Sequence, residues 1–158
     1  MTDAEFSHTE VIDLRVSPAQ MREFIMTPDR ILDYYPGPVG GGVLEAGRSI
    51  YCCGQGGVSL LEVLDDETTD RCVVIRVTTA FGLEAPYTRD RIEEAASFSM
   101  VEDWDLEPTD NGTRLTKTWR AIRERGALPF SLGDTLRASA ANETGALVEG
   151  WERAAGVA

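Results

Sequence analysis

The sequence is short of lysine, histidine and cysteine. It has 27 acidic residues against 15 basic ones, of which only Lys117 is a lysine, and its net charge is −12. A chain this acidic repels nucleic acids and anionic membranes, so neither is an expected partner. The single histidine, His8, cannot build a histidine-rich metal site. Cys52 and Cys53 are adjacent and would face opposite sides of a strand, so we expect buried free thiols and no metal.

Familiar catalytic and targeting signals are also missing. The chain has no nucleophile elbow, phosphate-binding loop, dinucleotide fingerprint or zinc-protease motif, and Gly40-Gly41-Gly42 lacks the lysine of a phosphate loop, which favours a flexible turn. No apolar run approaches the ~20 residues of a membrane span. The N-terminus is acidic, unlike a secretory signal. We therefore expect a cytoplasmic protein, monomeric or homodimeric, without a cofactor or membrane span.

The composition and the patterns in the sequence predict one α+β domain spanning residues 1–158. Hydrophobic residues make up 42% of the chain and charged residues 27%, which is ordinary for a globular domain. Ser17-Pro18 and Thr27-Pro28 each combine an N-cap with a proline at the first helical position and predict two short helices. Residues 82–96 form a long loop and a candidate flap. Alternating or continuous apolar patterns predict strands at 6–16, 48–53, 58–64, 72–81, 98–106 and 113–122.

The C-terminal quarter predicts one long helix over residues 131–155. Its apolar residues fall on a single stripe, typical of a helix that covers a sheet. Gly133 and Gly150 lie on the same stripe and either admit a close neighbour or only relax the helix. A curved antiparallel sheet of six to seven strands wrapped round this helix would leave a pocket between them. The stripe comprises Leu132, Leu136, Ala140, Leu147, Trp151 and Ala154.

The last predicted hairpin contains the most informative cluster. If the turn at Asn111-Gly112 pairs Leu106 with Leu115, then Trp104 lies opposite Lys117 and Glu102 opposite Trp119, all on the face of Met100. Inside the pocket, Lys117 would anchor a ligand carbonyl or carboxylate, and Glu102 is a candidate general acid or base. The alternative is a cation–π contact and ion pair on the solvent face. A one-residue slip exchanges the two interpretations.

Several segments, taken in their order along the chain, resemble the START/birch-pollen-allergen-like (SRPBCC) superfamily, and within it the polyketide cyclase/dehydrase and lipid-transport branch. Two departures from that pattern stand out: Arg22 replaces a tryptophan of the first helix, and Tyr34-Tyr35 replaces a tryptophan pair. The tyrosines either gate the pocket or pack before the Pro-Gly stop. The matching segments are Ile12-Asp13-Leu14-Arg15-Val16-Ser17-Pro18-Ala19-Gln20-Met21, residues 27–37, Ala46-Gly47-Arg48, residues 111–116 and the C-terminal helix.

The resemblance implies a helix-grip fold around a hydrophobic cavity and the binding, or transport, of a lipid, polyketide or aromatic molecule. It carries over no catalytic residue, because the superfamily shares no catalytic signature. A cyclase or dehydratase acting in the same cavity is the alternative function, and a protein-interaction module is a weaker third. The residues we expect at the ligand are Tyr34, Tyr35, Met100, Glu102, Trp104, Lys117, Trp119, Leu136, Leu147 and Trp151.

Overall fold

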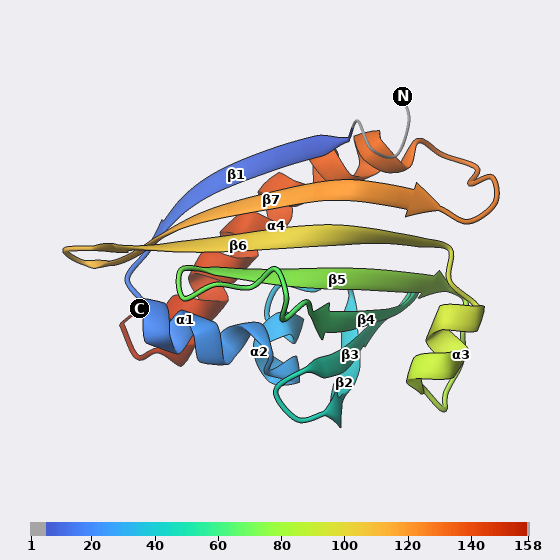
Figure 1. Ribbon diagram of the computed structural model, residues 1–158, viewed down its shortest axis with the longest axis horizontal. Coiled ribbons are helices and arrows are strands. Elements are labelled where there is room, and N and C mark those ends of the chain that lie inside the picture. The colour runs from blue at the N-terminus through green and yellow to red at the C-terminus, as the bar shows by residue number, and fades with distance from the viewer. Residues whose placement is uncertain (1–5, 158) are drawn as a thin grey trace.

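A computed structural model describes residues 6–157 and contains one seven-stranded antiparallel sheet (Figure 1). The strand order is β1-β7-β6-β5-β4-β3-β2, so the first strand closes against the last and β2 forms the other edge. From β2 to β7, each strand pairs antiparallel with the next strand in the chain, and only the connection between β5 and β6, residues 82–97, contains a helix. The strands are β1 (Ser7–Leu14), β2 (Pro38–Glu45), β3 (Ser49–Gly54), β4 (Gly57–Val63), β5 (Cys72–Phe81), β6 (Phe98–Thr109) and β7 (Gly112–Glu124).

Capping signals in the sequence set the helix starts. The Ser17 hydroxyl accepts a hydrogen bond from the Gln20 amide at 3.2 Å, and the Ser131 hydroxyl accepts one from the Asp134 amide at 3.4 Å. These bonds satisfy amides that have no partner in the first turn of a helix. The second short helix also starts as predicted, but Thr27 makes no cap hydrogen bond there, because its hydroxyl donates to the Glu23 carbonyl at 2.7 Å. The two short helices after β1 and the long C-terminal helix are confirmed. The helices are α1 (Pro18–Ile25), α2 (Pro28–Leu32), α3 (Arg89–Glu94) and α4 (Leu132–Ala154).

The glycine run that predicted a flexible turn instead lies in the edge strand β2, so that prediction is wrong. A Cβ at Gly41 would lie 2.7 Å from the Tyr51 carbonyl oxygen, and one at Gly42 would lie 2.7 Å from the Tyr51 ring. Only glycine permits so close an approach of β2 to its neighbours. Because β2 extends the sheet past β3, there are seven strands, the upper of the two numbers expected.

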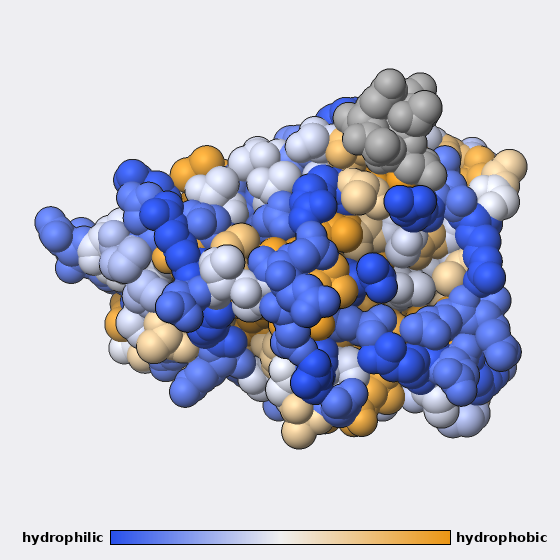
Figure 2. All heavy atoms as spheres, in the orientation of Figure 1, coloured by the Kyte–Doolittle hydropathy of each residue, from blue (hydrophilic) through white to orange (hydrophobic). Residues whose placement is uncertain are grey.

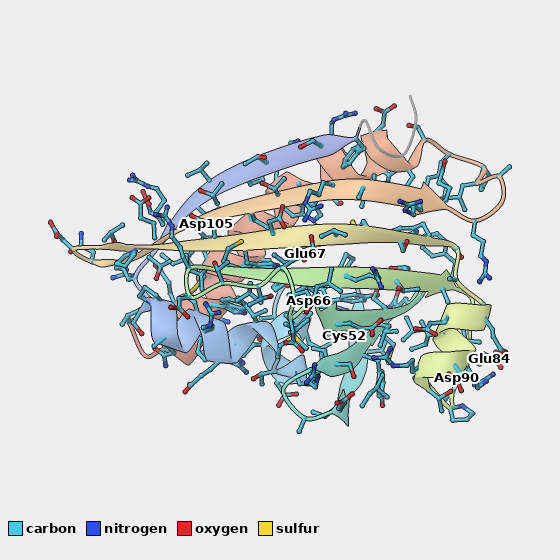
Figure 3. All side chains as sticks on the ribbon, in the orientation of Figure 1. Cys52, Asp66, Glu67, Glu84, Asp90 and Asp105 are labelled. Atoms are coloured by element: carbon cyan, nitrogen blue, oxygen red, sulfur yellow. The ribbon has the colours of Figure 1, made fainter. Side chains whose placement is uncertain are left out.

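The segment expected as a loop or flap holds α3, which packs away from the pocket. Thr88 caps this helix by accepting a hydrogen bond from the Arg91 amide, and Ile92 is fully buried. Ile92 packs with Cys53 and Ala80 in a small cluster on the sheet face opposite α4. In Figure 3, Glu84 and Asp90 lie beside α3 at one end of the sheet. Because Ile92 packs on the outer face, the segment does not cover the sheet face on which α4 lies.

The main core lies between the inner face of the sheet and the helices. Trp104 lies opposite Lys117, and Glu102 opposite Trp119, so the predicted hairpin register is confirmed. In Figure 1, α4 crosses behind β6 and β7. Hydrophilic residues predominate on the outer side, which faces the viewer in Figure 2. Arg76 is exposed there. No helix within residues 6–157 is long and apolar enough to cross a membrane.

Candidate functional site

A cavity of about 390 Å³ lies between the inner face of the sheet and α4. Alternate residues of β4, β5 and β6 form its floor, since alternate side chains of a strand share one face. Side chains from successive turns of α4 form its roof. The volume falls within the range of ligand pockets, ~300–1,000 Å³. The lining side chains include Leu61, Val77, Met100, Leu132, Leu136 and Ser139.

Two solvent-exposed phenylalanines lie at one end of the cavity. Phe81 at the end of β5 and Phe130 before α4 both line the cavity, and they are 44% and 41% exposed. Their rings meet edge to face with centroids 6.2 Å apart. The exposed Gly56 and Pro36 complete this rim. Large apolar side chains left exposed at a cavity mouth are suited to an apolar ligand entering from water.

A short line of hydroxyl groups crosses the cavity floor. The Tyr35 hydroxyl lies 3.0 Å from the Ser59 hydroxyl, which lies 2.8 Å from the Thr79 hydroxyl. All three side chains line the cavity. They give an otherwise apolar surface one site that both donates and accepts hydrogen bonds.

The closed end of the cavity adjoins a buried ion pair. Lys117 is 2% exposed and its ammonium nitrogen lies 3.6 Å from the Glu102 Oε1. The same nitrogen lies 4.3 Å, 4.5 Å and 4.9 Å from the ring centroids of Trp104, Trp119 and Tyr34. A buried ammonium needs such partners, because an unpaired one would be too costly to bury. The solvent-face interpretation of this hairpin is therefore wrong.

A second carboxylate, Glu143 of α4, faces this pair across the cavity. Burial raises the pKa of Glu143 to about 7, the Lys117 charge lowers it, and the Glu102 charge raises it. No hydrogen bond within residues 6–157 stabilises its ionised form. Burial and the two carboxylates raise the pKa of the Tyr34 hydroxyl well above its usual value. The closed end thus holds one neutralised ion pair and one carboxyl group that changes charge near neutral pH.

The ten residues expected at the ligand separate into two sets. Tyr34, Tyr35, Met100, Glu102 and Leu136 line the cavity. Tyr34 does not lie at the rim, because it is buried at the closed end against Trp151, whereas Tyr35 directly precedes the rim residue Pro36. The other five, which do not line it, are Trp104, Lys117, Trp119, Leu147 and Trp151.

Trp104, Trp119 and Leu147 do not line the cavity, and aromatic rings pack behind its closed end. Trp104 and Trp151 stack with centroids 5.6 Å apart. The Trp151 indole donates a hydrogen bond to the Arg30 carbonyl at 2.7 Å, and the Trp104 indole donates one to Glu102 at 3.1 Å. Rings with satisfied N–H groups make a stable wall behind the cavity.

Glu143 is the residue that the sequence interpretation missed. It lies three residues after Ala140 and four before Leu147, which places it on the apolar stripe of α4. An acidic residue on an otherwise apolar stripe was the available signal, because a helix rarely buries a carboxylate without a purpose or a partner. The hydroxyls of Ser59 and Thr79 carried no comparable signal, since both alternate normally with apolar neighbours.

The sequence departure at Arg22 and the thiols have structural explanations. Arg22 faces outward and donates a hydrogen bond to the Asp70 carbonyl at 2.7 Å, so it does not form part of the cavity wall. Cys52 and Cys53 are buried free thiols, as expected, and burial raises the pKa of Cys52 to about 12. Within residues 6–157, no three metal-binding side chains cluster together.

Solved structures share this arrangement, although no protein-family profile and no curated sequence matches the chain. A conserved protein from Geobacillus kaustophilus superposes with a TM-score of 0.68 at 14% identity, covering 93% of this chain and 95% of that one. Mll3558 from Rhizobium loti gives 0.61 at 15% identity, covering 91% and 95%. Ara h 8.0201 gives 0.58 at 12% identity, covering 92% and 94%.

The chain has the helix-grip fold. The likeness to Ara h 8.0201 is consistent with an SRPBCC-type fold, so the expected architecture is confirmed. At these identities the likeness concerns the fold alone. Any function of this chain must therefore be argued from its own cavity.

Proposed function

We propose that this protein binds, and carries, a hydrophobic small molecule in the cavity between the sheet and α4. A lipid, a polyketide or an aromatic compound has the required character. The proposal extends to the polyketide cyclase/dehydrase and lipid-transport branch that the sequence resembles. Direct contacts from the tryptophans, Lys117 and Leu147 are not part of it, because these residues do not line the cavity.

The observation that carries the proposal is the combination of an apolar cavity with an exposed phenylalanine rim. The walls offer few hydrogen-bonding groups apart from the hydroxyl line at Ser59 and the acidic end at Glu143. Ligand sites typically combine apolar walls with a few placed polar groups that orient the molecule. The arrangement suits an amphipathic ligand whose apolar part fills the cavity.

Uptake of Nile red, a neutral fluorescent probe, tests the proposal. Leu136→Trp should fill the cavity and reduce probe affinity by about tenfold or more, because the larger side chain takes the ligand's volume. Val11→Trp is the matched control, since Val11 is 64% exposed on the edge strand β1. Circular dichroism checks that both variants fold. Equal probe binding by the two variants would contradict the proposed location.

A second candidate, supported by Glu143, is acid–base catalysis of a cyclisation or dehydration in the same cavity. A carboxyl group whose pKa is about 7 can donate and accept protons at neutral pH. The molecule that co-purifies with the protein, identified by native mass spectrometry, would be incubated with fresh protein. Ring closure or loss of water, slowed by about 10²-fold or more in Glu143→Gln, would favour the enzyme. An unchanged molecule would favour the carrier.

A further inference from the structure

Two acidic side chains and one basic side chain lie at the closed end of the cavity, and this imbalance favours one kind of ligand head group. Glu102 is already matched by Lys117 and by the Trp104 indole. Glu143 lies across from them on α4 and has no hydrogen-bond partner within residues 6–157. It is therefore the acidic group left for a ligand.

The other groups that face Glu143 do not change this balance. Tyr34 and Tyr35, from the segment after α2, are neutral because burial raises the pKa of each hydroxyl. On β3, Cys52 is neutral for the same reason. From β1, Glu10 pairs in register with Lys117 and bonds to His8 at 2.8 Å, which adds no free positive charge. Lys117, Glu102 and Glu143 together are thus neutral when Glu143 is protonated and carry one net negative charge when it is not.

We propose that the cavity selects hydrophobic molecules with a protonated amine head, which the Glu143 carboxylate holds, and that it rejects fatty acids of equal length. This inference rests on the proposed ligand binding and names the ligand's chemistry. An ammonium group placed against Glu143 forms a charge-assisted hydrogen bond, which is stronger in a partly buried site than in open water. A ligand carboxylate in the same place would face two acidic side chains and no unshared cation.

Competition against Nile red by decylamine, 1-decanol and decanoate tests the selection. Wild-type protein at about pH 8.5, where Glu143 is ionised and the amine is still protonated, should bind decylamine about tenfold or more tightly than 1-decanol. Decanoate should bind most weakly. At about pH 5.5 Glu143 gains a proton, so the advantage of the amine should shrink while 1-decanol is unaffected.

Two variants identify the group responsible. Glu143→Gln should reduce decylamine affinity to that of 1-decanol and remove its pH dependence. Glu149→Gln is the matched control, because Glu149 lies on the same helix with its side chain 73% exposed, paired with Arg153. It should behave as the wild type. If Glu143→Gln does not fold, the pH series on the wild-type protein still tests the inference.

The outcomes separate this inference from the proposal beneath it. Equal binding of all three compounds, or tightest binding of decanoate, would overturn the amine selection while leaving hydrophobic binding intact. An amine preference that persists in Glu143→Gln would also overturn it. If neither Nile red nor any of the three compounds binds, both the inference and the proposed function fail.

Discussion

Lys117 and Glu102 are each stabilised by the other, so their substitutions should not be additive. Lys117→Met alone leaves the Glu102 carboxylate buried beside Glu143 and should lower the free energy of unfolding by about 3 kcal/mol. Adding Glu102→Gln removes that stranded charge and keeps an oxygen for the Trp104 indole. The double variant should then lie within about 1 kcal/mol of wild type. Urea unfolding measures all three proteins, and an equal loss in the single and double variants would contradict the pairing.

Glu143 should lower stability at high pH. In the folded protein its pKa is raised to about 7, while the unfolded value is near 4.5. Between these values the folded state binds the proton more strongly, so stability falls as pH rises and the full penalty applies above pH 7. Glu143→Gln should therefore be more stable than wild type by about 2 kcal/mol at pH 8, discounted for partial exposure.

The control for this prediction is the same comparison at low pH. Below about pH 4.5 the carboxyl is protonated in both states, so the variant and the wild type should be about equally stable. A stability difference of the same size at both pH values would show that the effect comes from packing. Urea unfolding at the two pH values decides between these results.

At the scale of elements, two glycines of α4 differ in what surrounds them. A Cβ at Gly150 would lie 2.7 Å from the Cβ of Asp33, just after α2, whereas a Cβ at Gly145 would meet nothing within 4 Å. Gly145→Ala should raise the free energy of unfolding by about 0.5–1 kcal/mol through helix propensity. Gly150→Ala should lower it by about 1–3 kcal/mol, because α2 must shift. Thermal unfolding checks both, and a gain at both positions would contradict the packing of α4 on α2.

An element could be predicted from the sequence when the residues that determine it lie within that element or in the turn beside it. The β6–β7 register followed from the Asn111-Gly112 turn and the alternating pattern beside it. β2 was missed because two of its glycines, Gly41 and Gly42, are required by Tyr51, a residue of the neighbouring strand. The short helix α3 was missed because Ile92 is its one fully buried residue and gives no periodic pattern. Elements defined by tertiary neighbours carry little signal in their own sequence.

The candidate site shows the same division. The pairing of Trp104, Lys117 and Glu102 was predictable because one hairpin positions all three. The position of Glu143 opposite them depends on how α4 lies across the sheet, which no single-element pattern fixes. The sequence also did not predict which end of the space between the sheet and α4 contains the cavity, because that depends on how Trp104 and Trp151 stack.

At the scale of the whole molecule, ligand binding should stabilise the fold. A molecule that binds only the folded state adds about 2.7 kcal/mol to the free energy of unfolding at one hundred times its Kd. Decylamine at saturation should therefore raise the Tm of the wild type and of Val11→Trp, but not that of Leu136→Trp. Scanning calorimetry with matched decylamine concentrations checks this. A similar increase in all three proteins would indicate binding outside the cavity.

A crystal structure of the complex with decylamine, grown at about pH 8, tests the central claim most directly. The account predicts the alkyl chain between Met100 of β6 and Leu136 of α4. It predicts the nitrogen at hydrogen-bond distance, about 3 Å, from the Glu143 carboxylate. Decylamine bound outside the cavity, or held with its nitrogen at the Phe81–Phe130 rim and away from Glu143, would contradict it.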